Sequence, residues 1–140
     1  MLNVLAVFVG GLIGTAVRFD LDILIPHTVI QPGWSTIIVN ISGSFILGVL
    51  TSTLWRRPST PSWVKAGLGT GVIGSFTTFS AVSVGVEMAG LSGKINTALI
   101  DLGFSLVGGL LAAFIGILVG SKVFNRPRPE AVIPDDGVDL

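Results

Sequence analysis

Long apolar stretches alternate with short polar ones along most of the chain. Four apolar stretches, at 4–26, 35–55, 64–88 and 96–121, each have about the 20 residues that an α-helix needs to cross a hydrocarbon core of ~30 Å. Glycine, proline and charged residues gather between them. The pattern predicts an all-α membrane protein, with four transmembrane helices in residues 1–122 and a polar, disordered tail at 123–140.

Small residues recur four positions apart inside the predicted helices. The pairs are Gly10 with Gly14, Ser44 with Gly48, Gly67 with Gly71, and Gly116 with Gly120. This spacing allows helix backbones to approach closely in lipid. Because four helices make a thin bundle, we expect at least two chains to associate around any pathway.

The composition agrees with a membrane location and excludes several other classes of function. Half of the residues are hydrophobic and 11% are charged. Cysteine is absent and His27 is the single histidine, so the chain cannot assemble a set of nucleophile, base and acid. We expect no enzyme activity and no nucleic-acid partner.

Lysine and arginine are unevenly divided between the two predicted membrane faces. Arg18 and Lys94 lie on one side. The other side carries Arg56, Arg57, Lys65, Lys122, Arg126 and Arg128. This bias predicts one fixed orientation in the plasma membrane, with both termini in the cytoplasm.

The most unusual polar residues lie within the third predicted helix, in the string Gly-Ser-Phe-Thr-Thr-Phe-Ser at 74–80. Gly74 lacks the Cβ that would favour helical geometry, and the hydroxyls of Thr77, Thr78 and Ser80 can bond to nearby backbone. We therefore predict that the third helix is broken near its middle. Such a break either frees carbonyl oxygens that can hold a monovalent cation or is a simple kink that neighbouring helices absorb.

Arg18 and Asn40 are polar residues at costly positions within the predicted spans. Arg18, near the end of the first helix, either reaches to the interface and pairs with Asp22 or provides a positive charge at an aqueous vestibule. Asn40, inside the second helix, either forms a hydrogen bond to another helix or donates its NH2 to a passing anion.

The remaining candidates are aromatic or acidic. Phe76 and Phe79 either pack in lipid and core or turn a positive ring edge toward an anion. Glu87 and Asp101 lie near helix ends, where we expect them to be solvated or paired with Lys94 rather than to form a proton relay.

Taken together, these residues resemble the fluoride channels of the Fluc (CrcB) family. The match comprises Gly10-Gly11-Leu-Ile-Gly14 with Arg18-Phe19, Val39-Asn40 with Gly43-Ser44-Phe45, the string at 74–80, and Ser105. The resemblance implies an antiparallel dimer of four-helix bundles, with two fluoride pathways and a structural sodium ion at the dimer centre. Fluoride would leave the cell passively through these pathways.

The resemblance also assigns roles to individual residues. The backbone carbonyls of Gly74 and Thr77 would ligate the sodium ion. The fluoride pathway would be lined by Asn40, Thr78, Ser80, Ser105 and the ring edge of Phe79, with Arg18 at its mouth.

This chain departs from the family pattern after Ser80. The family usually reads Thr-Thr-Phe-Ser-Thr-Phe, whereas this chain has Ala81 and Val82, so the second aromatic is missing, and Gly85 stands where the family often has a glutamate. Together with the charge bias, this leads to the hypothesis of a heterodimer with a paralogue that carries the missing phenylalanine.

Two other functions are alternatives. A proton-coupled exporter resembling the small multidrug resistance transporters would need a carboxylate deep in a span, and the first helix has none before Asp20. A non-conducting partner subunit would keep the fold without a complete pathway.

Overall fold

A computed structural model describes residues 1–25 and 33–124, which form helices joined by turns. The first two spans are helix α1 (Leu2–Leu24) and helix α2 (Trp34–Ser52). The third span contains α3 (Ser62–Lys65), the π-helical η1 (Ala66–Ile73), α4 (Gly74–Phe76) and α5 (Ser80–Leu91). The fourth contains α6 (Ile95–Gly103), the π-helical η2 (Phe104–Gly108) and α7 (Gly109–Phe124).

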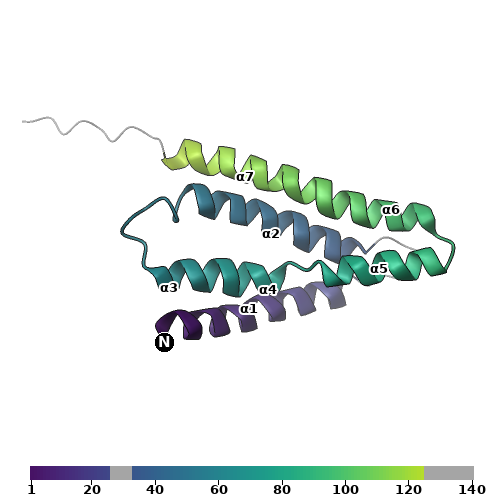
Figure 1. The fold of residues 1–140 in the computed structure, drawn as a ribbon, viewed down its shortest axis with the longest axis horizontal. Coiled ribbons are helices and arrows are strands. Elements are labelled where there is room, and N and C mark those ends of the chain that lie inside the picture. Colours follow the sequence, from purple (N-terminus) through teal and green to yellow (C-terminus); the bar gives the residue numbers. More distant parts are fainter. Residues whose placement is uncertain (26–32, 125–140) are drawn as a thin grey trace, which may run out of the picture.

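Four helical spans, Leu2–Leu24, Trp34–Ser52, Ser62–Leu91 and Ile95–Val123, are long and apolar enough to cross a membrane. This confirms the predicted all-α fold with four spans. In Figure 1 the N-terminus, α3 and the end of α7 lie at one end of the bundle. The predicted end of the first helix at residue 26, the loop residue His27 and most of the predicted tail lie outside the described residues.

The second helix ends at Ser52, three residues earlier than the sequence predicts. Thr53 leaves helical geometry (φ −115°, ψ −80°), and the ring of Trp55 then packs against Gly69 of the third span. Lys65 Nζ donates a hydrogen bond to Trp55 O at 3.2 Å. These contacts turn the chain back early, which sequence periodicity does not reveal.

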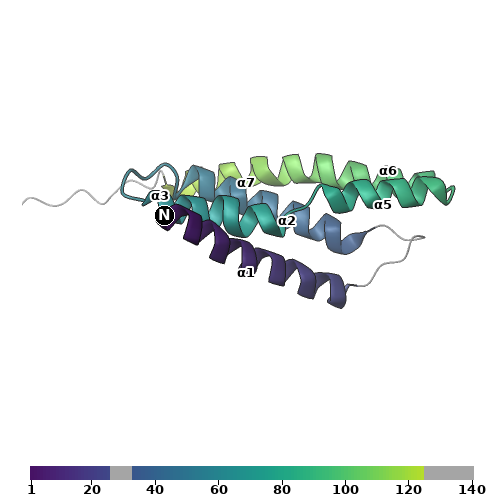
Figure 2. The same ribbon diagram turned by 60° about the horizontal axis from the view of Figure 1, so that its bottom comes forward.

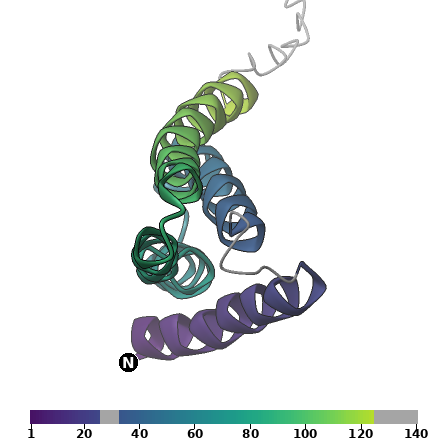
Figure 3. The same cartoon turned by 90° about the vertical axis from the view of Figure 1, so that its right-hand side faces the viewer.

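Glycines decide which helices lie side by side. In α1, a Cβ at Gly10 or Gly14 would collide with the backbone of η1. In α2, a Cβ at Gly48 would collide with the backbone of α7, and one at Gly116 of α7 would collide with that of α2. The predicted close approach is therefore confirmed, and it pairs α1 with η1 and α2 with α7, as the end-on view shows (Figure 3).

The third helix is broken near its middle, as predicted. Helix α4 ends at Phe76, Thr77 is extended (φ −77°, ψ 153°), and α5 begins at Ser80. Past the break, the chain runs beside α6 (Figures 1 and 2). The break lies within the predicted string at 74–80: Gly74 is still helical (φ −64°, ψ −28°), and Thr77 is the residue that leaves helical geometry.

Candidate functional site

Asn40 of α2 holds the break in the third helix. Its Nδ2 donates to Thr78 O at 2.9 Å, and Thr78 N donates to Asn40 Oδ1 at 2.8 Å. The amide therefore satisfies both polar backbone groups of a residue that lies between two helices. Of the two interpretations of Asn40, the structure shows the hydrogen bond to another helix, and it leaves one amide N–H for a further acceptor.

These bonds explain why two carbonyls of the third helix lose their usual donors. In a continuous α-helix, Thr78 N would donate to Gly74 O, and Ala81 N would donate to Thr77 O. Here Thr78 N donates to Asn40, and Ala81 N donates to Thr78 Oγ1 at 3.2 Å. Gly74 and Thr77 are the two residues that the resemblance assigns to sodium.

Two hydroxyl groups lie together where helix α5 begins. Thr78 Oγ1 accepts from Ala81 N, in the first turn of α5, and it lies 3.0 Å from Ser80 Oγ. Thr77 Oγ1 instead donates back to Ile73 O at 2.9 Å. The hydroxyls of Thr78 and Ser80 therefore form a pair at the start of α5, while Thr77 closes the end of α4.

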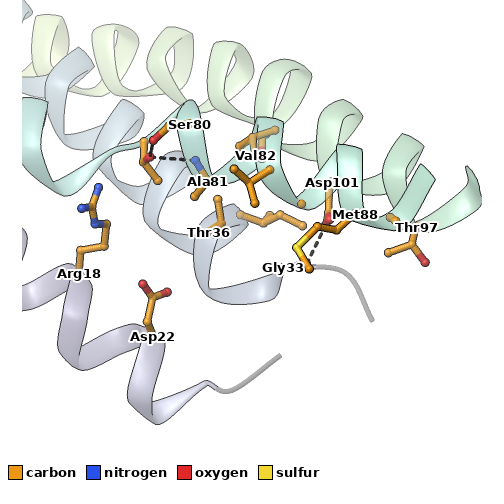
Figure 4. Close-up of a pocket in the computed structure, with 16 residues that line it drawn as sticks. Arg18, Asp22, Gly33, Thr36, Ser80, Ala81, Val82, Met88, Thr97 and Asp101 are labelled. Atoms are coloured by element: carbon orange, nitrogen blue, oxygen red, sulfur yellow. Dashed lines mark hydrogen bonds between the residues drawn. The ribbon is translucent and has the colours of Figure 1, made fainter. Parts of the chain in front are cut away.

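A cavity of about 540 Å³ lies between α1, the start of α2, α5 and α6 (Figure 4). Four predicted pathway residues line it, namely Arg18, Thr78, Ser80 and Ser105. Asn40 and Phe79 are not among its lining residues. The break thus carries hydroxyls into the same space as the guanidinium of α1.

Ser105 supplies a hydroxyl without a partner. It lies in η2 with 9% of its surface exposed, and its Oγ is the buried side-chain oxygen that has no hydrogen-bond partner within the described residues. Buried polar atoms of native proteins are normally paired. Ser105 lines the cavity, and its buried hydroxyl keeps an unused donor.

The two residues at the aromatic positions differ strongly in exposure. Phe79 is 65% exposed, and its ring lies on the outer surface of the single chain. Val82 is 2% exposed and lines the cavity. The position of the missing ring thus faces the interior of this chain, whereas the remaining ring faces away from it.

Arg18 is half-buried and lines the cavity, and Asp22 is exposed at its edge (Figure 4). Within the described residues these two side chains form no ion pair. The structure therefore does not show the predicted pair with Asp22. The other roles of Arg18, reach to the interface or a positive charge at a vestibule, stay predictions.

Asp101 contradicts the sequence-based expectation. Its carboxylate is only 6% exposed, and Oδ1 accepts a hydrogen bond from Gly33 N at 2.8 Å. Asp101 and Lys94 are both described residues, and they form no ion pair. Asp101 is therefore neither solvated nor paired with Lys94. Glu87, in contrast, is exposed. The missed signal was a charge four residues before Ser105 within an apolar span, a position where charges are costly.

The chain is similar to known proteins over most of its length. The model of the family described as "CrcB-like protein, Camphor Resistance (CrcB)" matches residues 5–117. A fluoride-specific ion channel FluC 2 of Ligilactobacillus salivarius is 39% identical over 121 residues, which cover 86% of this chain and 87% of that protein. FluC 2 of Bacillus licheniformis is 39% identical over 130 residues, with 93% and 96% covered. FluC of Pseudomonas syringae pv. tomato is 37% identical over 121 residues, with 82% and 94% covered.

Proposed function

The chain belongs to the CrcB family of fluoride-specific ion channels, which are not enzymes, and we propose that it forms part of a channel through which cytoplasmic fluoride leaves the cell passively. Such a channel would lower the toxicity of fluoride. The observation that supports this function is the cavity that Ser105 lines together with Thr78, Ser80 and Arg18, with the Ser105 hydroxyl unpaired among the described residues.

These side chains suit a small and strongly hydrated anion. Three hydroxyls can donate hydrogen bonds in place of water, and the guanidinium of Arg18 attracts negative charge at the mouth. A larger anion is disfavoured by its size, and because the same donors would replace its hydration water only in part. The remaining N–H of Asn40 and the ring edge of Phe79 extend this set of weak and strong donors beyond the cavity.

The exposed break supports an antiparallel dimer. Backbone without helical hydrogen bonds is tolerated at membrane depth only where protein or an aqueous cavity covers it. On this single chain Gly74 is exposed and Thr77 is half-buried, so the surface around the break needs a second chain against it. Phe79, which faces outward, would then line a pathway formed by both chains.

The carbonyl oxygens at the break fit a structural sodium ion. Within residues 1–25 and 33–124 no three His, Cys, Asp or Glu side chains gather as a metal site, but Gly74 O and Thr77 O have lost the donors of a continuous helix. Neutral carbonyl oxygens suit a hard monovalent cation. The proposal assigns both carbonyls to sodium, which would supply a positive charge between the two breaks.

The second chain is proposed to be a paralogue. Val82 stands at the second aromatic position, so at these two positions this chain offers one ring, Phe79. Arg56, Arg57 and Lys65 lie near one membrane face, which favours a single orientation. An antiparallel partner would then need the opposite charge bias, and it would supply the missing phenylalanine.

Fluoride efflux from liposomes tests the proposed function. We expect the chain with its paralogue to release fluoride when sodium is present, and little release by the chain alone. Phe79→Ile and Asn40→Asp variants should reduce the rate. Normal efflux from both variants would contradict the pathway, and efflux of a cationic dye driven by protons would favour an exporter instead. A complex that conducts equally well without this chain would identify it as a non-conducting subunit.

A further inference from the structure

A buried carboxylate, that of Asp101, lines the cavity. Asp101 Oδ1 is held by Gly33 N, and Oδ2 lies 3.4 Å from the place that a Cβ on Gly85 would occupy. One oxygen therefore binds the start of α2, while glycine at residue 85 leaves space beside the other. Both Gly85 and Asp101 line the cavity, and Figure 4 shows Asp101 beside Gly33.

Asp101 acts as a cap for α2 that comes from a distant part of the chain. Helix α2 has no side-chain cap of its own and no acidic residue in its first turn. A carboxylate at a helix N-terminus stabilises the unpaired N–H groups and the positive end of the helix dipole. This contact explains how a charge is kept inside an apolar span, but it uses only one of the two oxygens.

The charges around the cavity do not favour an anion. Among the described residues, its charged lining groups are Arg18 and Asp22 of α1 and Asp101 of α6, which sum to −1. Asp22 is exposed and is therefore screened by water, whereas Asp101 is buried. Because a charge acts more strongly where the surroundings are less polar, Asp101 has the larger effect on the cavity.

An anion that reaches Ser105 must pass near this carboxylate. Ser105 follows Asp101 by four residues, about one helical turn, and both line the cavity. The unpaired hydroxyl attracts an anion, while the carboxylate repels it. We infer that Asp101 limits anion access to this cavity, so that removal of its charge admits anions more readily.

The cavity can be probed without any conduction. The chain has no cysteine, so a single Thr36→Cys substitution places one thiol at the cavity wall. An anionic methanethiosulfonate reagent with a sulfonate group and a cationic one with a trimethylammonium group then report the local charge as a ratio of reaction rates. The Asp101→Asn variant removes the charge but keeps an oxygen that can accept from Gly33 N.

We expect Asp101→Asn to raise the ratio of anionic to cationic rates by about tenfold, because one charge affects the two reagents in opposite directions. Asp101→Glu keeps the charge and should leave the ratio low, even if the contact with Gly33 is disturbed. Glu87→Gln, the matched control at an exposed carboxylate, should change nothing. An unchanged ratio in Asp101→Asn, or an equal rise in Asp101→Glu, overturns the inference.

The link to fluoride rests on the proposed function and is tested separately. In liposomes that contain the conducting complex, Asp101→Asn should raise the initial fluoride efflux severalfold. A changed thiol ratio with unchanged efflux would overturn the statement that this charge limits fluoride. If no complex carries fluoride, the proposed function fails, and the thiol ratio still decides whether Asp101 repels anions.

Discussion

Replacement of Asn40 by alanine tests whether one amide holds the third helix open. Asn40→Ala removes the bonds of 2.9 Å and 2.8 Å to the backbone of Thr78. Hydrogen bonds between membrane helices contribute about 0.6 kcal/mol on average and up to about 1.7 kcal/mol. Two such bonds predict a loss of about 1–3 kcal/mol in the free energy of unfolding.

The same change should also close the break. Without Asn40, Thr78 N can again donate to Gly74 O, which is the bond of a continuous helix. The proposed sodium site would then lose one of its two carbonyls. In the wild-type complex, sodium at 100 times its dissociation constant would add about 2.7 kcal/mol of stability, and we expect this gain to disappear in Asn40→Ala.

The assay is unfolding of the purified protein in detergent, followed at several sodium concentrations with potassium as the replacement cation. Ser42→Ala is the matched control on the same helix, because Ser42 Oγ donates only to carbonyls of its own helix, Ile38 O and Val39 O. The reasoning is refuted if Asn40→Ala and Ser42→Ala unfold within about 0.5 kcal/mol of each other, a difference typical of surface substitutions.

Three further substitutions test other parts of the structure. Ser105→Ala should change the free energy of unfolding by less than about 0.5 kcal/mol, because the hydroxyl has no partner to lose, yet reduce fluoride efflux severalfold; a large loss of stability would show a hidden bond. Gly48→Val should destabilise the fold by more than about 2 kcal/mol in detergent unfolding, because its Cβ would meet the backbone of α7, whereas Gly90→Ala, which meets nothing, should not destabilise it. Val82→Phe should let the chain release fluoride from liposomes without a paralogue, since its ring would point into the cavity; efflux that still needs the paralogue would contradict the missing ring as the reason for the partner.

Local chemistry was enough to predict that the third helix breaks within residues 74–80, but not at which of them. The string contains both a glycine without a Cβ and the hydroxyls of Thr77, Thr78 and Ser80, and each favours a break. The break lies at Thr77 to Phe79, because the partner that competes for the backbone is Asn40, which is 38 residues away from Thr78. Hydrogen bonds over such separations leave no periodic signal in a sequence.

The sequence by itself determined the four apolar spans, the existence of the break and the glycine contacts, because membrane thickness, hydroxyl groups and missing side chains act locally or at regular spacing. Only the tertiary structure decided that Asp101 is buried at the start of α2, that Ser105 Oγ is left without a partner among the described residues, and that Val82 faces inward while Phe79 faces outward. Those outcomes depend on which helices meet and at what height. That arrangement is set by contacts among all four spans together, so no single stretch of sequence contains it.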